Sequence, residues 1–415
     1  MKAYVIITLN LCTMHGANMY ICNKTRYLKE RGYKVFVFSA EQGEIVIPGL
    51  REYKQCQKAF LRFYPGCFSR KRVSGYIGEM RDAIDAERYD EIIVESTNIF
   101  SALWGEILAE NLHCRHLTII LQERFSFSDG EQKFLRFKLS RHELAGINEP
   151  AVGKMLKDEN LPFDDSMRVT AYCNNTIDEC TDEISPKLNA EADLTIGSIG
   201  RLEKKYVLPL AKALGQYCKE HSGKKFNVVF IGGTREEKQP QRIQTAFSDC
   251  GNVNLILPGM QYPVPCSFVN RCDLFISAAG AAAATYFAKR PTIFLNPNTG
   301  DIIGIPGLTY THGDYTIYDA NYPISDLGSM IDKLLTERDQ IRYSDIMEDG
   351  TYKEKMNAEF DRQLRFVELC PDNCYYDTRT VLFTEKSYRP FNVLGKIVSP
   401  KLLCKGLELA RKHIK

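Results

Sequence analysis

The sequence predicts a mixed α/β fold of two doubly wound domains, because short apolar runs alternate with helical stretches in two separate series. The chain has 415 residues, and one hydrophobic core rarely grows beyond about 250–300 residues. A polar, turn-rich stretch at 174–186 separates the two series and suits a linker. We therefore expect an N-terminal domain over residues 1–180, a second domain over 186–370, and a basic tail over 371–415.

The first series begins with an apolar run at 2–9, which is too short for a signal-peptide core and has the length of a buried strand. Residues 18–31 have helical spacing and end at Gly32, a residue favoured just after a helix. Strands are also expected at 33–39, 90–95 and 116–121, a helix at 99–112, and a helix, a turn and a short strand over 147–169. This alternation predicts parallel βαβ units.

The second series repeats the pattern after the linker. Strands are expected at 192–199, 226–231, 274–277 and 291–295, and helices at 207–220 and 280–289. Two of these strands run into glycine turns, Gly200-Arg201 and Gly232-Gly233. Doubly wound sheets bind ligands at the carboxyl ends of their strands, so two such halves predict Rossmann-like domains facing each other across a ligand cleft.

Composition excludes several classes of protein. Hydrophobic residues make up 44% and charged residues 26%, which is ordinary for a globular protein and excludes a disordered or collagen-like chain. A net charge of +2 gives no overall reason to expect nucleic acid as a partner. The 14 cysteines are mostly scattered singly through apolar stretches, so we expect small buried side chains in a reducing compartment. No apolar run reaches 18 residues, so no membrane span is expected.

Cations follow the predicted strand at 192–199. Arg201, Lys204 and Lys205 come within one turn of its end. A forked guanidinium, an ammonium group and a helix N-terminus can meet a diphosphate there. A solvated helix start with ordinary surface lysines explains the same residues equally well.

Two other loops contain small residues that suit close approach of a ligand. Gly280 follows the strand at 274–277 and opens an alanine-rich stretch, where a phosphate or ribose can reach backbone N–H groups. Tight helix–sheet packing is the alternative. Gly16 lies between the first strand and the first helix, and His15 beside it is either a polar group of a site or a solvated loop residue. The spacing around Gly16 is not G-x-G-x-x-G, so it does not predict a dinucleotide site.

Taken in order, these segments resemble the GT-B glycosyltransferases, close to family 4, also called glycosyl transferases group 1. The similar motifs are His15-Gly16-Ala17 with residues 30–35, then 169–178, 199–205 through Ala213, 226–233, 253–259 and 307–314. The order of the motifs is specific, whereas each motif alone is not. The resemblance spans most of residues 1–330 and implies a GT-B architecture, with an acceptor-side domain first and a nucleotide-sugar donor domain second.

The resemblance also implies roles for individual residues. Arg201 and Lys205 would hold the donor diphosphate, with Lys204 as the rival of Lys205 because the spacing from the arginine is tighter than in the family. The loop at Gly259-Met260 would contact the nucleobase through its backbone.

The chain departs from the family at two positions. Glu123 stands where the family has a catalytic-site histidine and is our polar candidate there, together with His15. The acidic E-x7-E motif of the family is absent, since alanines fill 281–284 and Thr285 follows them. Thr285 would replace the ribose contact with a hydroxyl. The missing glutamates indicate an altered donor, an altered mechanism or a lost activity.

From these residues and this resemblance we expect a hexosyltransferase-like enzyme. It would move a sugar from a UDP- or GDP-linked donor to a glycan or lipid-linked acceptor in cell-surface polysaccharide synthesis. No Asp-x-Asp motif stands in a suitable loop, so we expect no metal and no cofactor, with Arg201 and a lysine in place of the metal. A non-catalytic subunit that binds glycan or scaffolds a complex is the main alternative, and a nucleotide-sugar epimerase on the same scaffold is the other.

Two basic stretches complete the pattern. Residues 58–72 interleave aromatic residues with cations, and residues 386–415 hold eight Lys and Arg residues against one Glu. Such segments suit an anionic bilayer, which would hold a cytoplasmic protein peripherally on the inner face of the plasma membrane. The alternative is that the tail packs back on the N-terminal domain and leaves a solvated basic face.

Overall fold

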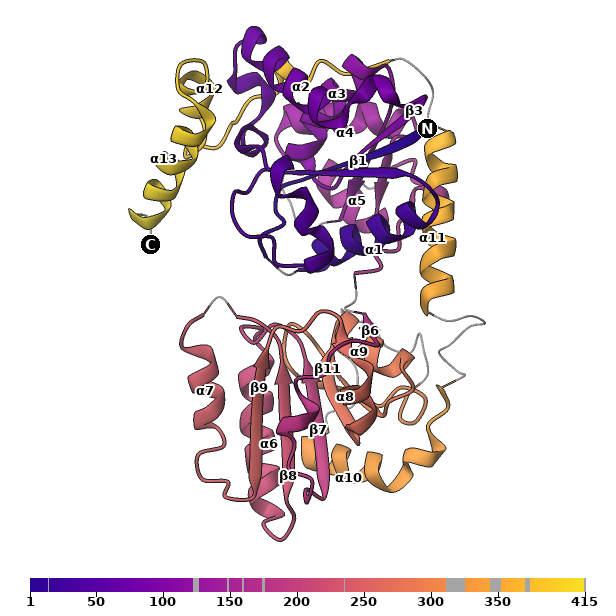
Figure 1. Cartoon of the computed structure of the whole chain (residues 1–415), viewed down its shortest axis with the longest axis vertical. Helices are drawn as coiled ribbons and strands as arrows, with labels where there is room; N and C mark the ends of the chain where they lie inside the picture. The colour runs from indigo at the N-terminus through magenta and orange to yellow at the C-terminus, as the bar shows by residue number, and fades with distance from the viewer. Residues whose placement is uncertain are drawn as a thin grey trace. The chain divides into compact units, whose positions relative to one another are not determined.

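The computed structural model describes residues 1–13, 15–121, 127–147, 149–158, 160–173, 176–234, 236–310, 325–343, 352–369 and 374–413. The chain forms two compact units, each with its own sheet (Figure 1). Unit 1 comprises Met1–Cys173 and Met356–Lys415, and unit 2 comprises Asn174–Lys355. Since residues 356–369 belong to unit 1, the second unit ends before residue 370, where we placed its limit.

Unit 1 is built on a parallel sheet of five strands in the order β2-β1-β3-β4-β5. The strands are β1 (Lys2–Thr8), β2 (Lys34–Ser39), β3 (Glu91–Ser96), β4 (Arg115–Ile120) and β5 (Leu144–Gly146). Helices α1 (Gly16–Glu30), α2 (Arg70–Ile84), α3 (Ile99–Leu112), α4 (Asp129–Ser140) and α5 (Glu149–Leu156) connect or follow them. The chain reverses direction across the sheet between β1 and β3, and such a switch point is where doubly wound sheets bind ligands.

The central elements of unit 1 follow from local sequence. Six of the seven residues of β1 are buried, as expected for a parallel strand that is covered on both faces. Helix α3 begins with a capping box between Asn98 and Ser101, and ends at His113 in the left-handed region, with φ of 50°. Its apolar residues lie all around the helix, and ten of its fourteen residues are buried, so α3 is a core helix.

Helix α11 (Tyr352–Glu368) returns the chain to unit 1. The ring of Phe360 lies 5.8 Å from that of Tyr20 and 5.2 Å from that of Tyr27, both on α1. Gln363 accepts a hydrogen bond of 2.8 Å from the buried Lys24 ammonium. These contacts explain why this helix belongs to the N-terminal unit.

Unit 2 contains a sheet of six strands in the order β13-β12-β11-β7-β8-β9, parallel except for β13. The strands are β7 (Leu194–Ile199), β8 (Phe226–Ile231), β9 (Val253–Gly259), β11 (Leu274–Ala278), β12 (Thr292–Leu295) and β13 (Ile302–Gly304). The helices are α6 (Val207–Glu220), α7 (Gln239–Thr245), α8 (Cys266–Arg271), α9 (Ala279–Phe287) and α10 (Leu327–Glu337), and β6 (Ile177–Asp178) pairs with β10 (Val264–Pro265). The switch point lies between β7 and β11. The prediction of an α/β fold with two Rossmann-like domains is confirmed.

Short 3-10 turns and the C-terminal helices complete the described chain. The turns of unit 1 are η1 (Pro48–Cys56), η2 (Ala59–Arg62), η3 (Pro65–Cys67), η4 (Ala86–Arg88), η5 (Asp165–Met167) and η9 (Thr378–Thr380). Those of unit 2 are η6 (Ser185–Lys187) and η7 (Arg338–Gln340). Helices α12 (Phe391–Leu394) and α13 (Pro400–His413) belong to unit 1. Within the described residues, no helix has both the length and the apolar character needed to cross a bilayer.

Candidate functional site

The loops that follow β7, β8 and β9 in unit 2 join through their backbones. The hydrogen bonds run from Gly200 N to Ile231 O (2.9 Å), from Leu202 N to Gly233 O (3.0 Å) and from Gly232 N to Gly259 O (2.9 Å). Because these three strands are parallel, all three loops lie at the carboxyl edge of the sheet. This is the edge at which doubly wound sheets bind ligands.

Gly232 is the tightest point of this edge. A Cβ at Gly232 would lie 1.9 Å from the carbonyl oxygen of Gly200, which no packing can accommodate without moving the backbone. A Cβ at the neighbouring Gly233 would meet Met260 Cβ at 3.6 Å, an ordinary contact. The position of the Gly200-Arg201 turn therefore depends on the missing side chain of Gly232.

Arg201 lies directly after this contact. Its guanidinium Nη1 is 3.3 Å from Glu203 Oε1, and its side chain is 36% exposed. The other carboxylate oxygen of Glu203, Oε2, is buried without a hydrogen-bond partner among the described residues. One long ion pair engages little of a guanidinium that has five N–H donors, so Arg201 can bind an anion through the rest.

Lys204, Lys205 and Tyr206 occupy the turn between Arg201 and α6. Both lysines are exposed. Surrounding protein atoms and then the charge of Arg201 lower the pKa of Lys204. Tyr206 is buried, and burial raises the pKa of its hydroxyl to about 12 against the opposing effect of Arg201. The turn thus places the Lys204 ammonium and a neutral phenol within electrostatic reach of the guanidinium, and it carries a second exposed lysine, Lys205.

Helix α6 starts immediately after this turn, at Val207. Its N-cap residue, Tyr206, makes no side-chain capping hydrogen bond. The first N–H groups of a helix lack intrahelical acceptors and carry the positive end of the helix dipole. The turn that carries Arg201 and the lysines therefore opens onto a helix N-terminus, as the sequence predicted.

The loop between β11 and α9 has a second helix N-terminus at the same edge. Ala279 has a φ of 51°, a left-handed conformation that is uncommon for a residue with a side chain. The N-cap, Ala278, supplies no capping side chain, and Gly280 lies in the first turn. The Oγ of Ser277 accepts a hydrogen bond of 3.0 Å from Ile199 N, which joins β11 to β7 at the switch point. The arrangement fits the anion approach expected at Gly280.

Thr285 is placed differently from our expectation. Its side chain is fully buried. The hydroxyl donates to Ala282 O at 3.0 Å and lies 3.0 Å from Thr292 Oγ1 in the interface between α9 and β12. The hydroxyl is engaged inside unit 2, so the proposed ribose contact through Thr285 is wrong.

Gly259 ends β9 at the carboxyl edge, and Met260 follows it. Gly259 has a φ of 77°, a conformation that glycine adopts without strain. The side chain of Met260 is half-buried, with its Cβ facing the Gly233 backbone. Both residues thus lie beside the glycine turn that follows β8.

The candidates of unit 1 lie at the start of α1. Gly16 is its first residue, and His15, half-buried and extended, is its N-cap and does not cap the helix through its side chain. A Cβ at Gly16 would lie 3.3 Å from Cys173 Cβ, so a larger side chain would be crowded. Glu123, our other catalytic candidate, lies outside the described residues.

Unit 1 also contains a buried polar cluster that the sequence analysis missed. His116 Nδ1 is 2.7 Å from Glu106 Oε2, and His116 Nε2 is 3.0 Å from Ser96 Oγ. The Lys138 ammonium donates to the same carboxylate oxygen of Glu106 at 2.8 Å. Serine, imidazole and carboxylate stand in the order of a catalytic triad, but all three side chains are at most 1% exposed. No substrate reaches them, so the cluster is structural.

The protonation states of this cluster follow from its burial. Burial opposes the charge on Glu106, but Lys138 and His116 outweigh it and hold the pKa of Glu106 at about 2. Burial, helped by the charge of Lys138, lowers the pKa of His116 to about 4. His116 is therefore neutral at pH 7, donating from Nδ1 to Glu106 and accepting at Nε2.

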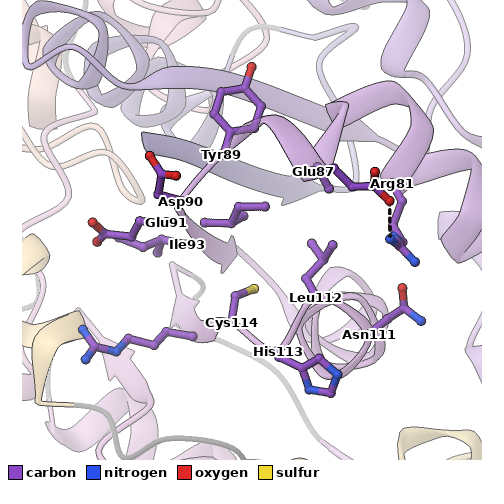
Figure 2. Close-up of a pocket in the computed structure, with 13 residues that line it drawn as sticks. Arg81, Glu87, Tyr89, Asp90, Glu91, Ile93, Asn111, Leu112, His113 and Cys114 are labelled. Carbon is purple, nitrogen blue, oxygen red and sulfur yellow. Dashed lines mark ion pairs between the residues drawn. The ribbon is translucent and has the colours of Figure 1, made fainter. Parts of the chain in front are cut away.

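A pocket of about 570 Å³ lies elsewhere in unit 1 (Figure 2). Tyr89 and Asp90 line it just before β3, and His113 and Cys114 line it just before β4. It lies at the amino ends of these strands, opposite the edge where doubly wound sheets bind ligands. None of the predicted site residues that the structure describes lines this pocket, so we do not assign the site there.

Comparisons with known proteins find a likeness in structure alone. No family model matches the sequence, and no curated protein matches it. One similar structure is a glycosyltransferase from Rickettsia africae, with 13% identity and a TM-score of 0.56. The alignment covers 89% of the present chain and 99% of the Rickettsia chain. Another is Anabaena Alr3699/HepE in complex with UDP and glucose, with 12% identity and a TM-score of 0.51. The alignment covers 88% of the present chain and 96% of the Anabaena chain.

A UDP-GlcNAc 2-epimerase from Neisseria meningitidis, bound to UDP-GlcNAc, also matches, with 11% identity and a TM-score of 0.48. The alignment covers 88% of the present chain and 100% of the Neisseria chain. The likeness to the first two structures, at identities of 12–13%, shows the fold and not the activity. The chain has the GT-B fold, with two Rossmann-like domains.

Proposed function

We propose that the chain is a glycosyltransferase that moves a hexose from a nucleoside diphosphate donor to a glycan or lipid-linked acceptor. One observation carries the proposal. The carboxyl edge of the unit 2 sheet combines Arg201, two exposed lysines and the helix N-termini of α6 and α9, whose N-cap residues make no side-chain capping hydrogen bond. Cations and orphan N–H groups gathered at one edge are what a diphosphate requires.

The chemistry that this edge can perform is departure of the diphosphate. As the bond from the sugar to the diphosphate breaks, negative charge grows on the leaving oxygen. Arg201 can neutralise it through a forked pair of hydrogen bonds, and Lys204 and Lys205 can add charge from the same turn. This role for the protein cations is the basis of our proposal that transfer needs no metal and no cofactor.

The donor class is supported by the fold and by one neighbour. Alr3699/HepE was crystallised with UDP and glucose, and UDP- or GDP-hexoses are accordingly our first donors to test. Gly259 and Met260 are proposed to meet the nucleobase, since Gly259 ends the strand next to β8 and Met260 faces the glycine turn that follows β8. We place the reaction in cell-surface polysaccharide synthesis by a cytoplasmic protein.

The second candidate function is a non-catalytic nucleotide- or glycan-binding subunit. It is favoured by the α9 segment, where alanines replace the acidic motif and the Thr285 hydroxyl is buried. Without glutamates or an accessible hydroxyl on α9, the site keeps its cations for the diphosphate. It lacks side-chain acceptors on this helix for the donor sugar, so it could bind a nucleotide without transferring a sugar.

Turnover of labelled donors by the purified full chain separates these functions. We expect release of UDP or GDP from one nucleotide hexose that depends on an added glycan or lipid extract. Arg201→Ala should slow the release about 100-fold, because it removes the main diphosphate cation. Lys212→Ala, which removes an exposed lysine of α6, is the matched control and should release nucleotide at the wild-type rate.

The other outcomes select other functions. Tight nucleotide binding without release from any donor would contradict transfer and favour the binding subunit. An epimerised sugar formed without acceptor would identify an epimerase instead.

A further inference from the structure

Exposed apolar side chains gather on the C-terminal segment of unit 1. Seven large hydrophobic side chains are exposed in the described residues, and five of them lie within 382–402. We call four of these the apolar face: Val393 (62% exposed), Leu394 (42%), Ile397 (74%) and Leu402 (60%). Single exposed hydrophobic residues are common, but such a concentration in one short segment indicates a binding surface.

The segment that carries the apolar face is firmly held. The guanidinium of Arg72 on α2 donates to the carbonyl oxygens of Gly395 (2.8 Å), Ile397 (3.0 Å) and Val398 (2.6 Å). On the inner side, the ring of Phe391 packs 5.2 Å from Phe63, and that of Phe383 stacks 4.0 Å from Tyr64. The outward direction of the apolar face is therefore fixed by packing and hydrogen bonds.

Cations flank this face. Between residues 382 and 405 the only acid is Glu385, and the basic rim consists of Lys386, Arg389, Lys396, Lys401 and Lys405, all exposed. Arg70 and Lys71 are also exposed and precede Arg72, which binds the same turn. The sulfur of Cys404 on α13 faces the carbonyl oxygen of Ala59 at 3.9 Å. The two basic stretches of the sequence thus come together on one side of unit 1.

The structure changes how the first of these stretches is understood. Its aromatic residues Phe60, Phe63, Tyr64 and Phe68 are buried, so they belong to the core and do not alternate with cations on a surface. The exposed apolar residues come instead from the second stretch, between its lysines.

We propose that the apolar face and the basic rim bind the surface of a bilayer with anionic headgroups. Aliphatic side chains ringed by cations suit the boundary between acyl chains and headgroups, and each cation near that surface adds about five-fold to the affinity. A protein partner fits less well, because lysine is depleted and aromatic residues are enriched at protein interfaces. Four of the five rim cations are lysines, and no aromatic residue is among the seven exposed large hydrophobic residues.

Binding to a bilayer also bears on the class of acceptor. An enzyme held on a bilayer meets an acceptor that is carried by lipid, so we assign a lipid-linked saccharide over a free glycan. That assignment rests on the proposed glycosyl transfer, whereas the binding of unit 1 to lipid does not.

Cosedimentation of the full chain with vesicles tests the proposal. We expect binding to vesicles of phosphatidylcholine and phosphatidylglycerol in a 7:3 ratio that weakens with salt, and much less binding to phosphatidylcholine alone. The double variant Val393→Glu/Ile397→Glu should bind at least 10-fold more weakly. Lys396→Ala/Lys401→Ala should lose about 25-fold on the anionic vesicles, from two cations at about five-fold each. Leu369→Glu (Leu369 is 64% exposed on unit 1) and Lys212→Ala are the controls and should bind as wild type.

Two readouts keep the outcomes distinct. Unchanged fluorescence of Trp104, the single tryptophan and a buried residue of unit 1, shows that each variant is folded. UDP and GDP affinities, measured on the same preparations, report the nucleotide site separately. The proposal is overturned if the wild-type protein does not bind anionic vesicles, or if Val393→Glu/Ile397→Glu binds them as tightly as the wild type does. A dimer that becomes monomeric in Val393→Glu/Ile397→Glu, without vesicle binding, would assign the apolar face to a second copy instead.

Discussion

Gly232→Ala is expected to weaken nucleoside diphosphate binding at least 10-fold and to slow transfer about 100-fold. The new Cβ would stand 1.9 Å from Gly200 O, so the turn that carries Arg201 must shift. A displacement of about 1 Å in a group that positions the reacting atoms is enough for a rate loss of this size. Isothermal titration with UDP and GDP measures the binding, and nucleotide release measures the rate.

The next residue supplies the control. Gly233→Ala adds the same methyl group with an ordinary contact of 3.6 Å to Met260, and Gly223→Ala adds it in open space. Both variants should bind nucleotide nearly as wild type does. Equal affinities for Gly232→Ala and Gly233→Ala would show that the Gly200-Arg201 turn does not position the ligand.

The second large effect is expected on stability. Glu106→Ala should lower the free energy of unfolding of unit 1 by about 3–5 kcal/mol, the range for breaking a buried ion pair. The carboxylate of Glu106 accepts hydrogen bonds from Lys138 at 2.8 Å, from His116 at 2.7 Å and from Tyr376 N at 2.9 Å. The alanine leaves the buried ammonium and imidazole donors without that acceptor, and the hydrogen bond from Tyr376 N also holds the C-terminal segment to α3.

Trp104 makes this measurement specific to unit 1. It is the only tryptophan of the chain, it is buried on α3, and its indole donates to Phe63 O at 2.7 Å. Urea unfolding followed by its fluorescence therefore reports the unit that contains Glu106. Glu110→Ala, one turn along the same helix at a partly exposed position, should change stability by less than about 0.5 kcal/mol. Similar midpoints for the two variants would show that the Glu106 cluster contributes little.

Much of the fold could be predicted from local sequence. The expected bounds of α3, β8 and α6 coincide with the observed Ile99–Leu112, Phe226–Ile231 and Val207–Glu220. All six residues of β8 are buried, and a run that is apolar except for Asn227 and is followed by glycines leaves little ambiguity. In the edge strand β9 one residue of seven is buried, so its apolar pattern is weak, and only the family resemblance pointed to it. The partner of α11 could not be predicted, because helical periodicity does not say which unit covers the helix.

The residues of the candidate site also fall into two groups, those that could be predicted from local sequence and those that could not. Arg201 and the glycine turns could be found because their chemistry depends on residues adjacent in sequence. The burial of Thr285 could not be found, because it depends on the packing of α9 against β12. The fully buried pair of Lys24 and Glu95 joins residues 71 positions apart, and no local spacing indicates such a contact. Contacts between distant segments are what the structure adds.

The measurement that tests the account most directly is a thermal-unfolding panel of UDP, GDP, ADP and CMP on wild type, Arg201→Ala and Lys212→Ala. A ligand at 100 times its dissociation constant stabilises the folded state by about 2.7 kcal/mol, which raises the melting temperature by several degrees. We predict such a shift with UDP or GDP for wild type and Lys212→Ala. In Arg201→Ala the affinity should fall about 30-fold, so at the same ligand concentration the shift should shrink to about one third. An equal shift in Arg201→Ala, or no shift with any nucleotide, would contradict a diphosphate site at the carboxyl edge of unit 2.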